Sequence, residues 1–512
     1  MTYAVWGWGD APPSRADLEA VAPLVAATTG FPAQEPETPA GLPELPAPRC
    51  ALPTALAHLG STEPVDRARH GIGRSYRDLV RGLRGELTDV PDVVARPTTE
   101  RDVVDLLDWA ASEHVGVVPF GGGTSVVGGV EPRGLGRSVS LDLAGLAGLV
   151  EVDEVSRAVR LRAGTLGPAA ESALRPHGLT LRFYPQSFER STVGGWVATR
   201  AAGHFSTGPT HIDDLVESVR AVTPAGTWES RRLPGSGAGP SPDRLLLGSE
   251  GSLGVITETW LRAQPRPEHR WAATAVGSWE QGVSAARALT HAGLRPAACR
   301  LLDPVEARLS GTRTTGEAVL VLGLESLRGP VDVGSALELV RGAGLAVTEQ
   351  GTRGESGEAW RSTFVRAPYL REGLVLLGIL VETFETAVTW DRLEAFVAAV
   401  TEAATEAVRK VCGDGAVGCR LTHTYTDGAA PYFTVLAPAR RGSEVAQWDE
   451  IKTAASEAIL TAGGTITHHH AVGRDHRPWY DQQRPEPFAL ALRGAKAAVD
   501  PDGIMNPGVL LG

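Results

Sequence analysis

Between residues 91 and 265, short apolar runs of strand length alternate with amphipathic stretches of helix length. The stretch after "PDVVARP" predicts a helix, because Thr99 and Asp102 have the spacing of a capping box. One face of this helix is apolar and consists of Val103, Leu106, Leu107 and Ala110. A second apolar run, Val115–Val118, predicts a strand directly after it.

A second region, residues 271–475, has strand patterns interleaved with alanine-rich helical ones. "EAVLVLGLES" and "LVLLGILVET" predict strands, and "DRLEAFVAAVTEAATEAVRKV" predicts a long helix. Prolines in "LRAQPRPEHR" interrupt both patterns and mark a boundary. We therefore expect an α+β protein. Its parts are an irregular segment with one or two helices, a first domain of alternating strands and helices, a second α+β domain and a C-terminal segment, at residues 1–90, 91–266, 267–479 and 480–512.

The composition indicates which binding partners and which cellular compartment are expected for the protein. A net charge of −11 and a pI near 5.7 argue against nucleic-acid binding, which needs a basic face. Four cysteines without CxxC spacing indicate reduced thiols in the cytoplasm. The N-terminus lacks the pattern of an export signal, and no run approaches 18 uncharged apolar residues, so we expect no membrane span.

Three loops rich in small residues lie beside predicted strands. The first is "PFGGGTSVVGGV" at 119–130; the others are "PQSFERSTVGGWVATRAAG" at 185–203 and "GSEGSLGVITE" at 248–258. Neither G-x-G-x-x-G nor the P-loop spacing occurs in the first loop. Glycine lets backbone N–H groups approach a diphosphate closely, although a glycine-rich loop can also serve only as a turn. Three such loops favour one extended ligand that crosses several turns.

These loops, with "DDLVESVRAVTPAG", resemble the FAD-binding domain of the vanillyl-alcohol-oxidase superfamily. The resemblance implies a PCMH-type FAD-binding domain of two subdomains and a cap domain with an antiparallel sheet. It places the FAD diphosphate on the first loop. The residues that it assigns to FAD are Pro119, Phe120, Gly121, Gly122, Gly123, Thr124, Ser125, Pro185, Gln186, Ser187, Ser191, Thr192, Gly194, Gly195, Thr199, Arg200, Ala201, Glu250, Gly251, Gly254, Val255 and Ile256.

Later motifs narrow the resemblance to the alkylglycerone-phosphate synthase family of ether-lipid synthesis. They are "WGWGD", "AACRLLDP", "TFETAVTWDR", "CRLTHTYTDGAAPYF" and "GGTITHHHAVGRDHRPW". Two features depart from that family. Phe183 stands where its members commonly carry a histidine, and the end "DPDGIMNPGVLL" is more similar to general flavin dehydrogenases.

Three consecutive histidines, His468, His469 and His470, allow a metal site, a general base or a surface tract, and no acidic partner is fixed by spacing. If they lie on a strand, they cannot all face one way. Metal-dependent flavin dehydrogenases of the superfamily carry a glutamate where this chain has His469, and a histidine near Tyr432. The resemblance therefore implies no metal, with His469 or His470 as the base.

The resemblance makes Tyr432 the catalytic acid, although a strand tyrosine can equally be a core residue. It also places Arg300, Arg371 and Arg420 around the active site, where guanidinium groups suit a phosphate. Each arginine could instead form a structural ion pair, such as Arg371 with Glu372 or Glu382.

The expected reaction exchanges the acyl group of acyl-dihydroxyacetone phosphate for a long-chain alcohol. Flavin N5 would act as a covalent tether, without net redox change. The alternatives are an FAD-dependent oxidase or dehydrogenase of an alcohol or hydroxy acid, and a non-catalytic flavin-binding protein. We also expect a lipid substrate, peripheral contact with a membrane, a cytoplasmic location and a homodimer.

Overall fold

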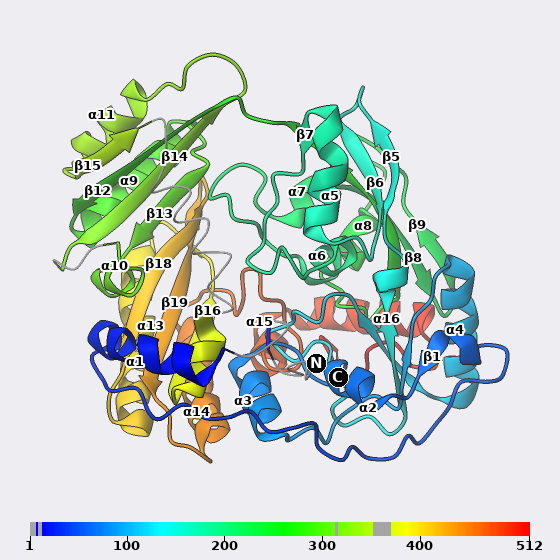
Figure 1. Ribbon diagram of the computed structural model, residues 1–512. Helices are drawn as coiled ribbons and strands as arrows, with labels where there is room; N and C mark the ends of the chain where they lie inside the picture. The colour runs from blue at the N-terminus through cyan, green and yellow to red at the C-terminus, as the bar shows by residue number, and fades with distance from the viewer. Residues whose placement is uncertain (1–6, 9–12, 313–315, 352–369, 512) are drawn as a thin grey trace.

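The computed structural model describes residues 7–8, 13–312, 316–351 and 370–511 (Figure 1). One sheet has the order β1-β2-β4-β3, in which β2, β4 and β3 run parallel and β1 antiparallel. Its strands are β1 (Gly60–Ser61), β2 (Val93–Ala95), β3 (Gly116–Phe120) and β4 (Ser138–Asp142). Helix α4 (Glu100–Glu113) begins with the predicted capping box and buries the predicted apolar face in this sheet's core.

A five-stranded antiparallel sheet stands beside it, in the order β5-β6-β10-β8-β9. Its strands are β5 (Leu149–Asp153), β6 (Ala158–Arg162), β8 (Val216–Thr223), β9 (Gly226–Glu229) and β10 (Val255–Arg262). Helices α5 (Gly167–Leu174) and α6 (Val193–Thr199) pack into its separate core. The expected two subdomains are therefore present, each with its own hydrophobic core.

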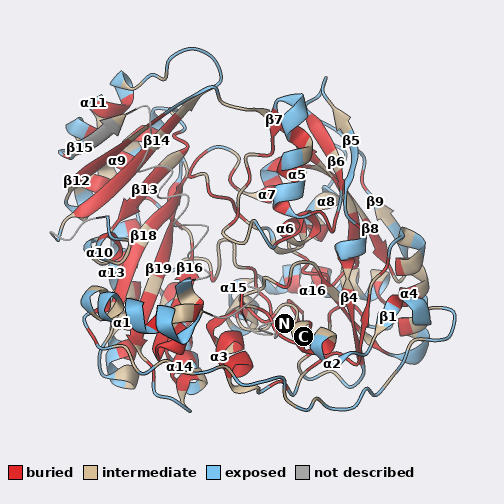
Figure 2. Cartoon of the chain, viewed as in Figure 1, coloured by how far each residue is buried: buried red, intermediate tan, exposed pale blue. Residues whose placement is uncertain are grey.

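The cap contains an eight-stranded antiparallel sheet with the order β15-β12-β14-β13-β18-β19-β16, and β17 pairs with β19. Its strands are β12 (His269–Gly277), β13 (Ala298–Leu302), β14 (Ala318–Ser326), β15 (Ala346–Gly351), β16 (Ile379–Glu385), β17 (Val388–Thr389), β18 (Ala416–Thr424) and β19 (Gly428–Pro438). The helices packed against it are α9 (Trp279–His291), α11 (Gly334–Gly342), α13 (Leu393–Cys412) and α14 (Glu444–Thr461). Figure 2 shows the buried residues concentrated in the central strands of this sheet, such as β14, β13 and β18. The predicted fold class is confirmed.

Both chain ends are built into this architecture. In the described part of the segment before β2 there are three α-helices, α1 (Arg15–Thr29), α2 (Pro64–Arg69) and α3 (Tyr76–Arg84), where one or two were expected. Helix α3 packs against α14 in the cap core, so this segment is less irregular than its composition suggested. After α15 (Arg477–Gln483) and α16 (Glu486–Val499), the last residues return to β3, where Val117 bridges Met505.

One local prediction is wrong, and one condition considered for the histidines does not apply. "LVLLGILV", expected as one strand, is helical up to residue 376, and strand β16 begins only at Ile379. A continuous apolar run cannot be assigned to helix or strand by periodicity, and both halves are buried here. The three histidines lie on an irregular loop, residues 465–473, and not on a strand. Among the helices that the structure describes, none is both long and apolar enough to cross a membrane.

Candidate active site

A cavity of about 420 Å³ lies where the three small-residue loops face the cap sheet. Polar side chains of the cap strands form one wall of the cavity. Successive side chains of a strand point to opposite faces, so the polar ones face the cavity and the apolar ones face the core. On β18, Arg420 and Thr422 line the cavity, whereas Cys419 and Leu421 belong to the core. On β19, Tyr432 lines the cavity and Phe433 is buried behind it.

The glycines of the first loop allow it to lie directly against the second loop. A Cβ on Gly122 would stand 1.7 Å from the carbonyl oxygen of Arg190, and one on Gly121 would stand 2.4 Å from Thr192 Oγ1. Gly123 has a φ of +64°, which favours glycine. Two backbone turns therefore meet at one wall of the cavity. These glycines therefore permit a close contact between two loops of the protein. From the sequence, their small size was explained only by the close approach of a ligand.

The same loop fits a diphosphate. Among the described residues, none accepts a hydrogen bond from the backbone N–H groups of residues 121–126, although Gly121 to Val126 all line the cavity. Buried N–H groups are nearly always satisfied, and consecutive ones form an anion-binding nest. An acidic phosphate ligand suits them.

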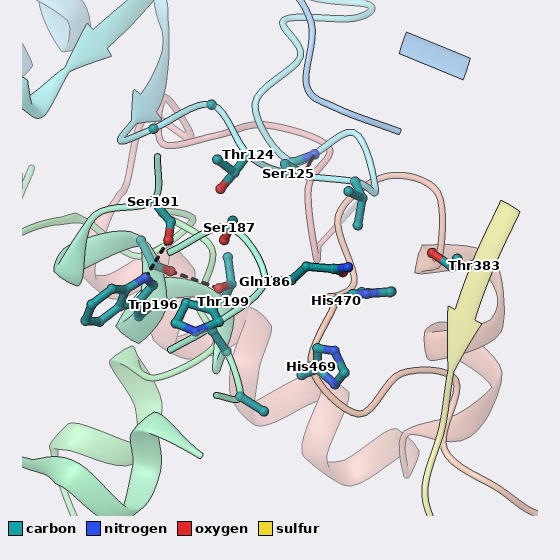
Figure 3. A pocket seen from close by; sticks show the side chains of 18 of the residues that line it. Thr124, Ser125, Gln186, Ser187, Ser191, Trp196, Thr199, Thr383, His469 and His470 are labelled. Atoms are coloured by element: carbon teal, nitrogen blue, oxygen red, sulfur yellow. Dashed lines mark hydrogen bonds between the residues drawn. The ribbon is translucent and has the colours of Figure 1, made fainter. Parts of the chain in front are cut away.

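The second and third loops are fixed from behind. In the second loop, Trp196 Nε1 donates to Ser191 Oγ at 2.7 Å, and Figure 3 draws this hydrogen bond. The Glu250 carboxylate accepts the N–H groups of Val472 (2.9 Å) and Gly473 (2.8 Å), which joins the third loop to the histidine loop. Burial raises the pKa of Glu250 to about 7, although these two hydrogen bonds oppose the shift.

Of the residues predicted to bind FAD, all but Arg200 and Val255 line the cavity. Arg200 is paired with Asp213 at 2.7 Å, and its side chain is 58% exposed. Val255 faces the core of the parallel sheet. Because Val255 begins strand β10, its neighbours Gly254 and Ile256 reach the cavity and it does not. Phe183, at the family's histidine position, is buried against Trp196 outside the cavity.

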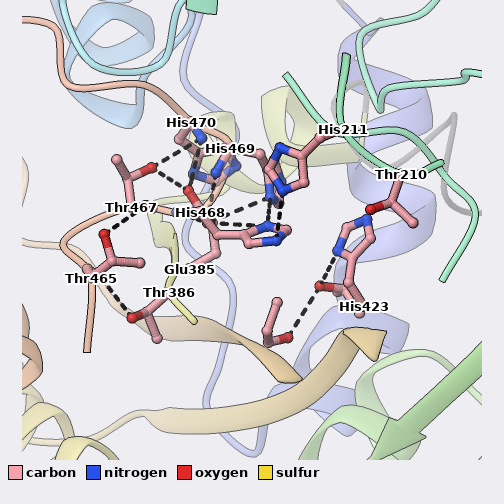
Figure 4. Close-up of polar contacts among 12 residues, drawn as sticks. Thr210, His211, Glu385, Thr386, His423, Thr465, Thr467, His468, His469 and His470 are labelled. Carbon is pink, nitrogen blue, oxygen red and sulfur yellow. Dashed lines mark hydrogen bonds and ion pairs between the residues drawn. The ribbon is translucent and has the colours of Figure 1, made fainter. Parts of the chain in front are cut away.

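The histidine loop is wrapped around one buried carboxylate, Glu385 (Figure 4). Its two oxygens accept the backbone N–H groups of His468 (2.5 Å), His469 (3.0 Å) and His470 (2.8 Å). The Thr467 hydroxyl adds a fourth hydrogen bond at 2.6 Å. Burial alone would raise the pKa of Glu385, but the histidines and Thr467 hold it well below its usual value. Sequence spacing could not reveal this acidic partner, and the buried loop is no surface tract.

The three histidines have different positions. His469 and His470 line the cavity, whereas His468 lies behind them and does not. Their Nδ1 atoms are 3.4 Å and 3.5 Å from Glu385, so the opposite ring edges are left for the cavity. Burial lowers the pKa of His469, and that of His470 well below its usual value. Both are therefore neutral at pH 7, as a general base must be.

Tyr432 is stacked on His469, with ring centroids 6.2 Å apart, and it lies beneath the Arg420 guanidinium at 3.9 Å. Burial raises the pKa of Tyr432, and Arg420 opposes that shift. The phenol therefore stays protonated at neutral pH. A cation over its ring stabilises the phenolate that forms when it donates a proton.

All three predicted arginines line the cavity. Arg420 pairs with Glu306 at 2.7 Å, so one of the expected structural ion pairs exists. Arg371 donates to the Arg74 carbonyl, whereas Glu382 is held by Trp448 and Lys452. Burial, and then Arg420, lowers the pKa of Arg300 to about 9. Two buried guanidinium groups that repel one another favour a bound anion.

Several lining residues escaped the sequence analysis. His423 follows Thr422, and both line the cavity because the strand pairing shifts register between Leu421 and His423. Simple alternation predicts the wrong face for His423. Apolar side chains also line the cavity: Trp8, Leu309, Leu370, Leu374, Val381 and Leu436. Of the early "WGWGD" motif only Gly7 and Trp8 lie within the described residues.

His476, just after the histidine loop, predicts a pH-dependent stability. Burial, and then Lys452, lowers its pKa to about 4. The folded protein holds it neutral while the unfolded chain binds a proton below about pH 6.5, so its contribution is complete above 6.5 and is lost as the pH falls towards 4. We measure the free energy of unfolding in denaturant for the parent and for His476→Gln. We expect the difference between the two to fall by about 2 kcal/mol from pH 7 to pH 5. A constant difference would contradict this.

Two family models match the chain. A model described as FAD binding domain covers residues 91–230, and one described as FAD linked oxidases, C-terminal domain, covers residues 266–510. The cradle of free N–H groups lies within the first match. The protein uses FAD.

Curated relatives identify the family. An alkyldihydroxyacetonephosphate synthase of Caenorhabditis elegans is 32% identical over 479 residues, which cover 87% of this chain and 80% of the relative. The chain belongs to the alkyldihydroxyacetonephosphate synthase family. A synthase of Dictyostelium discoideum is 29% identical and covers 88% of this chain and 78% of its own. This synthase-family protein is thus an enzyme.

Solved structures agree on the fold. A structure of alkyldihydroxyacetonephosphate synthase superposes with a TM-score of 0.82 at 23% identity and covers 99% of this chain and 97% of the other. A substrate-bound p-cresol methylhydroxylase gives 0.71 at 13% identity, covering 88% and 94%. The architecture is therefore shared with enzymes whose names denote different reactions.

Proposed function

We propose that the protein converts acyl-dihydroxyacetone phosphate and a long-chain alcohol into alkyl-dihydroxyacetone phosphate and a fatty acid. The supporting observation is that one cavity brings together the N–H cradle, a neutral histidine beside a protonated tyrosine, buried guanidinium groups and an apolar strip. FAD needs the N–H cradle, and a lipid with a phosphorylated head group needs the other groups.

The residues have separate roles in the exchange. His469 takes a proton from C1, the carbon that carries the acyl ester. Tyr432 donates its proton to the carboxylate as the C1–O bond breaks, and Arg420 stabilises the resulting phenolate. The alcohol oxygen then bonds to C1 and passes its proton to the Tyr432 phenolate, and C1 regains a proton from His469. FAD, held by the small-residue loops, would supply an electron-accepting ring beside this carbon.

The lipid nature of both substrates matches the apolar side of the cavity. Leu309 lies at the end of α10 (Pro304–Leu309), and Leu370 and Leu374 lie on the helical segment before β16. Burial of each methylene contributes about 0.8 kcal/mol, so an apolar path suits alkyl chains. We propose further that the enzyme works in the cytoplasm at a membrane surface, where such substrates reside, and as a homodimer.

Product analysis tests the proposed reaction. The purified FAD-loaded protein is incubated with palmitoyl-dihydroxyacetone phosphate and hexadecanol, and the ether product is sought by mass spectrometry. We expect hexadecyl-dihydroxyacetone phosphate and free palmitate. Stable bleaching of the flavin by a substrate without oxygen, and no ether, would favour an oxidoreductase instead. If the experiment gives neither ether product nor bleached flavin, a non-catalytic flavoprotein is favoured.

Arg371 provides a test of the phosphate site. We expect Arg371→Met to raise KM for the phosphorylated substrate by about tenfold or more, because a charge-assisted hydrogen bond is lost. KM for acyl-dihydroxyacetone, which lacks the phosphate, should not change. Arg101→Met, on an exposed helix surface, is the matched control. Equal changes for both substrates would place the phosphate elsewhere.

A further inference from the structure

A chain of hydrogen-bonded side chains begins at His469 and leads away from the cavity. His469 Nδ1 is 3.0 Å from His468 Nδ1, and His468 Nε2 is 2.6 Å from the Tyr425 hydroxyl. The Tyr425 hydroxyl is in turn 3.2 Å from Thr210 Oγ1. His211 joins from the side, with its Nε2 2.9 Å from His468 Nε2, as Figure 4 shows. The reaction proposed above uses none of these groups except His469.

The chain leads from the site towards exposed residues. His468 is nearly buried, with 5% of its side chain exposed, and Tyr425 is half-buried. Thr426 and Asp427, which follow Tyr425, are exposed. Thr210, at the far end, is itself fully buried, but its backbone N–H donates to exposed Asp214 at 3.2 Å. The carboxylate of Asp214 is therefore the group through which the far end of the chain reaches solvent.

Every link can carry a proton in either direction, because imidazole and hydroxyl groups both donate and accept. In one arrangement, His469 Nδ1–H donates to His468 Nδ1, His468 Nε2–H donates to the Tyr425 oxygen, and the Tyr425 O–H donates to Thr210. His469 Nε2 then has a free lone pair and faces the cavity. When Nε2 accepts a proton, a one-step shift along the chain reverses every hydrogen bond and releases a proton at the outer end.

Such a route matters because the substrate blocks the direct one. The His469 side chain is only 18% exposed, and the cavity that it lines must hold FAD and the lipid substrate. A substrate that fills the cavity displaces water from His469, so a proton taken from C1 needs another path to solvent. C1 carries two hydrogens in the substrate and two in the product, so one hydrogen leaves and one returns in each turnover.

We propose that His468 and Tyr425 form a proton relay that exchanges the C1 proton held by His469 with solvent while the cavity is occupied. This inference rests on the proposed function. His468 and Tyr425 are positioning residues, since neither lines the cavity, and Thr210 is the outer end of the relay. A purely structural cluster would leave the exchange of the C1 hydrogen unchanged.

Isotope retention tests the relay. Substrate deuterated at C1 is converted in ordinary water, and deuterium in the ether product is measured for the parent and for Tyr425→Phe. Phenylalanine keeps the ring but removes the hydroxyl. We expect the variant to retain at least about threefold more deuterium at the exchangeable position and to turn over about tenfold more slowly, with KM and FAD content unchanged.

Two further variants separate the outcomes. Tyr480→Phe, beside Arg484 and outside the cavity, is the matched control and should behave like the parent. If Tyr425→Phe does not bind FAD, His468→Asn is judged by the same criteria. Parent-like retention in a folded variant overturns the relay and leaves the proposed reaction intact. No ether product from the parent overturns both.

Discussion

Tyr432→Phe is expected to lower turnover by about 10²- to 10⁴-fold while FAD remains bound, because the variant lacks the proton that the leaving carboxylate needs. Phenylalanine preserves the stacking on His469 and the contact with the Arg420 guanidinium. The core around β19 should therefore be unaffected. Ether product formation and the visible flavin spectrum are measured on the same preparation.

The same experiment excludes a packing effect. The thermal unfolding midpoint of Tyr432→Phe should lie within a few degrees of the parent's, since only a hydroxyl is removed. Tyr480→Phe again serves as the control for loss of a phenol elsewhere. Turnover close to that of the parent would remove Tyr432 from the acid role, whatever the fate of FAD.

Gly122→Ala is expected to give a protein that no longer holds FAD. The new Cβ would stand 1.7 Å from the Arg190 carbonyl oxygen, which is backbone and cannot rotate away. The first and second loops must then separate, and the row of free N–H groups loses its shape. Overpacking of this kind costs about 1–3 kcal/mol in stability, in addition to the lost cofactor site.

The matched control is Gly136→Ala. Gly136 is exposed, and a Cβ there meets nothing within 4 Å. Flavin absorbance per protein chain, followed by titration of the stripped protein with FAD, measures both variants. We expect Gly136→Ala to bind FAD as the parent does. Full FAD occupancy in Gly122→Ala would show that the loop contact can relax without cost.

The functional groups of the site come from two parts of the fold. The loops of the FAD-binding subdomains contribute mainly backbone N–H groups and small side chains, whereas the cap contributes the tyrosine, histidines and arginines. Glu250 joins the two sides through the N–H groups of Val472 and Gly473. A buried group at this junction transmits a displacement of either side to the other, because packed interiors deform little.

Local patterns predicted much of the fold. The Thr99–Asp102 capping box and the apolar face of α4 depend only on residues within one helix, and they appear as expected. The three glycine loops were recognised because their composition is unusual over short stretches. The strand predicted at 374–381 failed at its first half, since burial on all sides makes a helix and a strand equally apolar there.

The amino-acid sequence by itself determined the α+β class, the FAD loops and the residue types of the site, because periodicity, capping and glycine content act over short distances along the chain. Only the tertiary structure decided which groups meet. Glu385, more than 80 residues before the histidines, gathers their N–H groups. A register shift turns His423 to the cavity, and Asp213 draws Arg200 away from it. These outcomes depend on contacts between distant segments, and local pattern carries no information about such contacts.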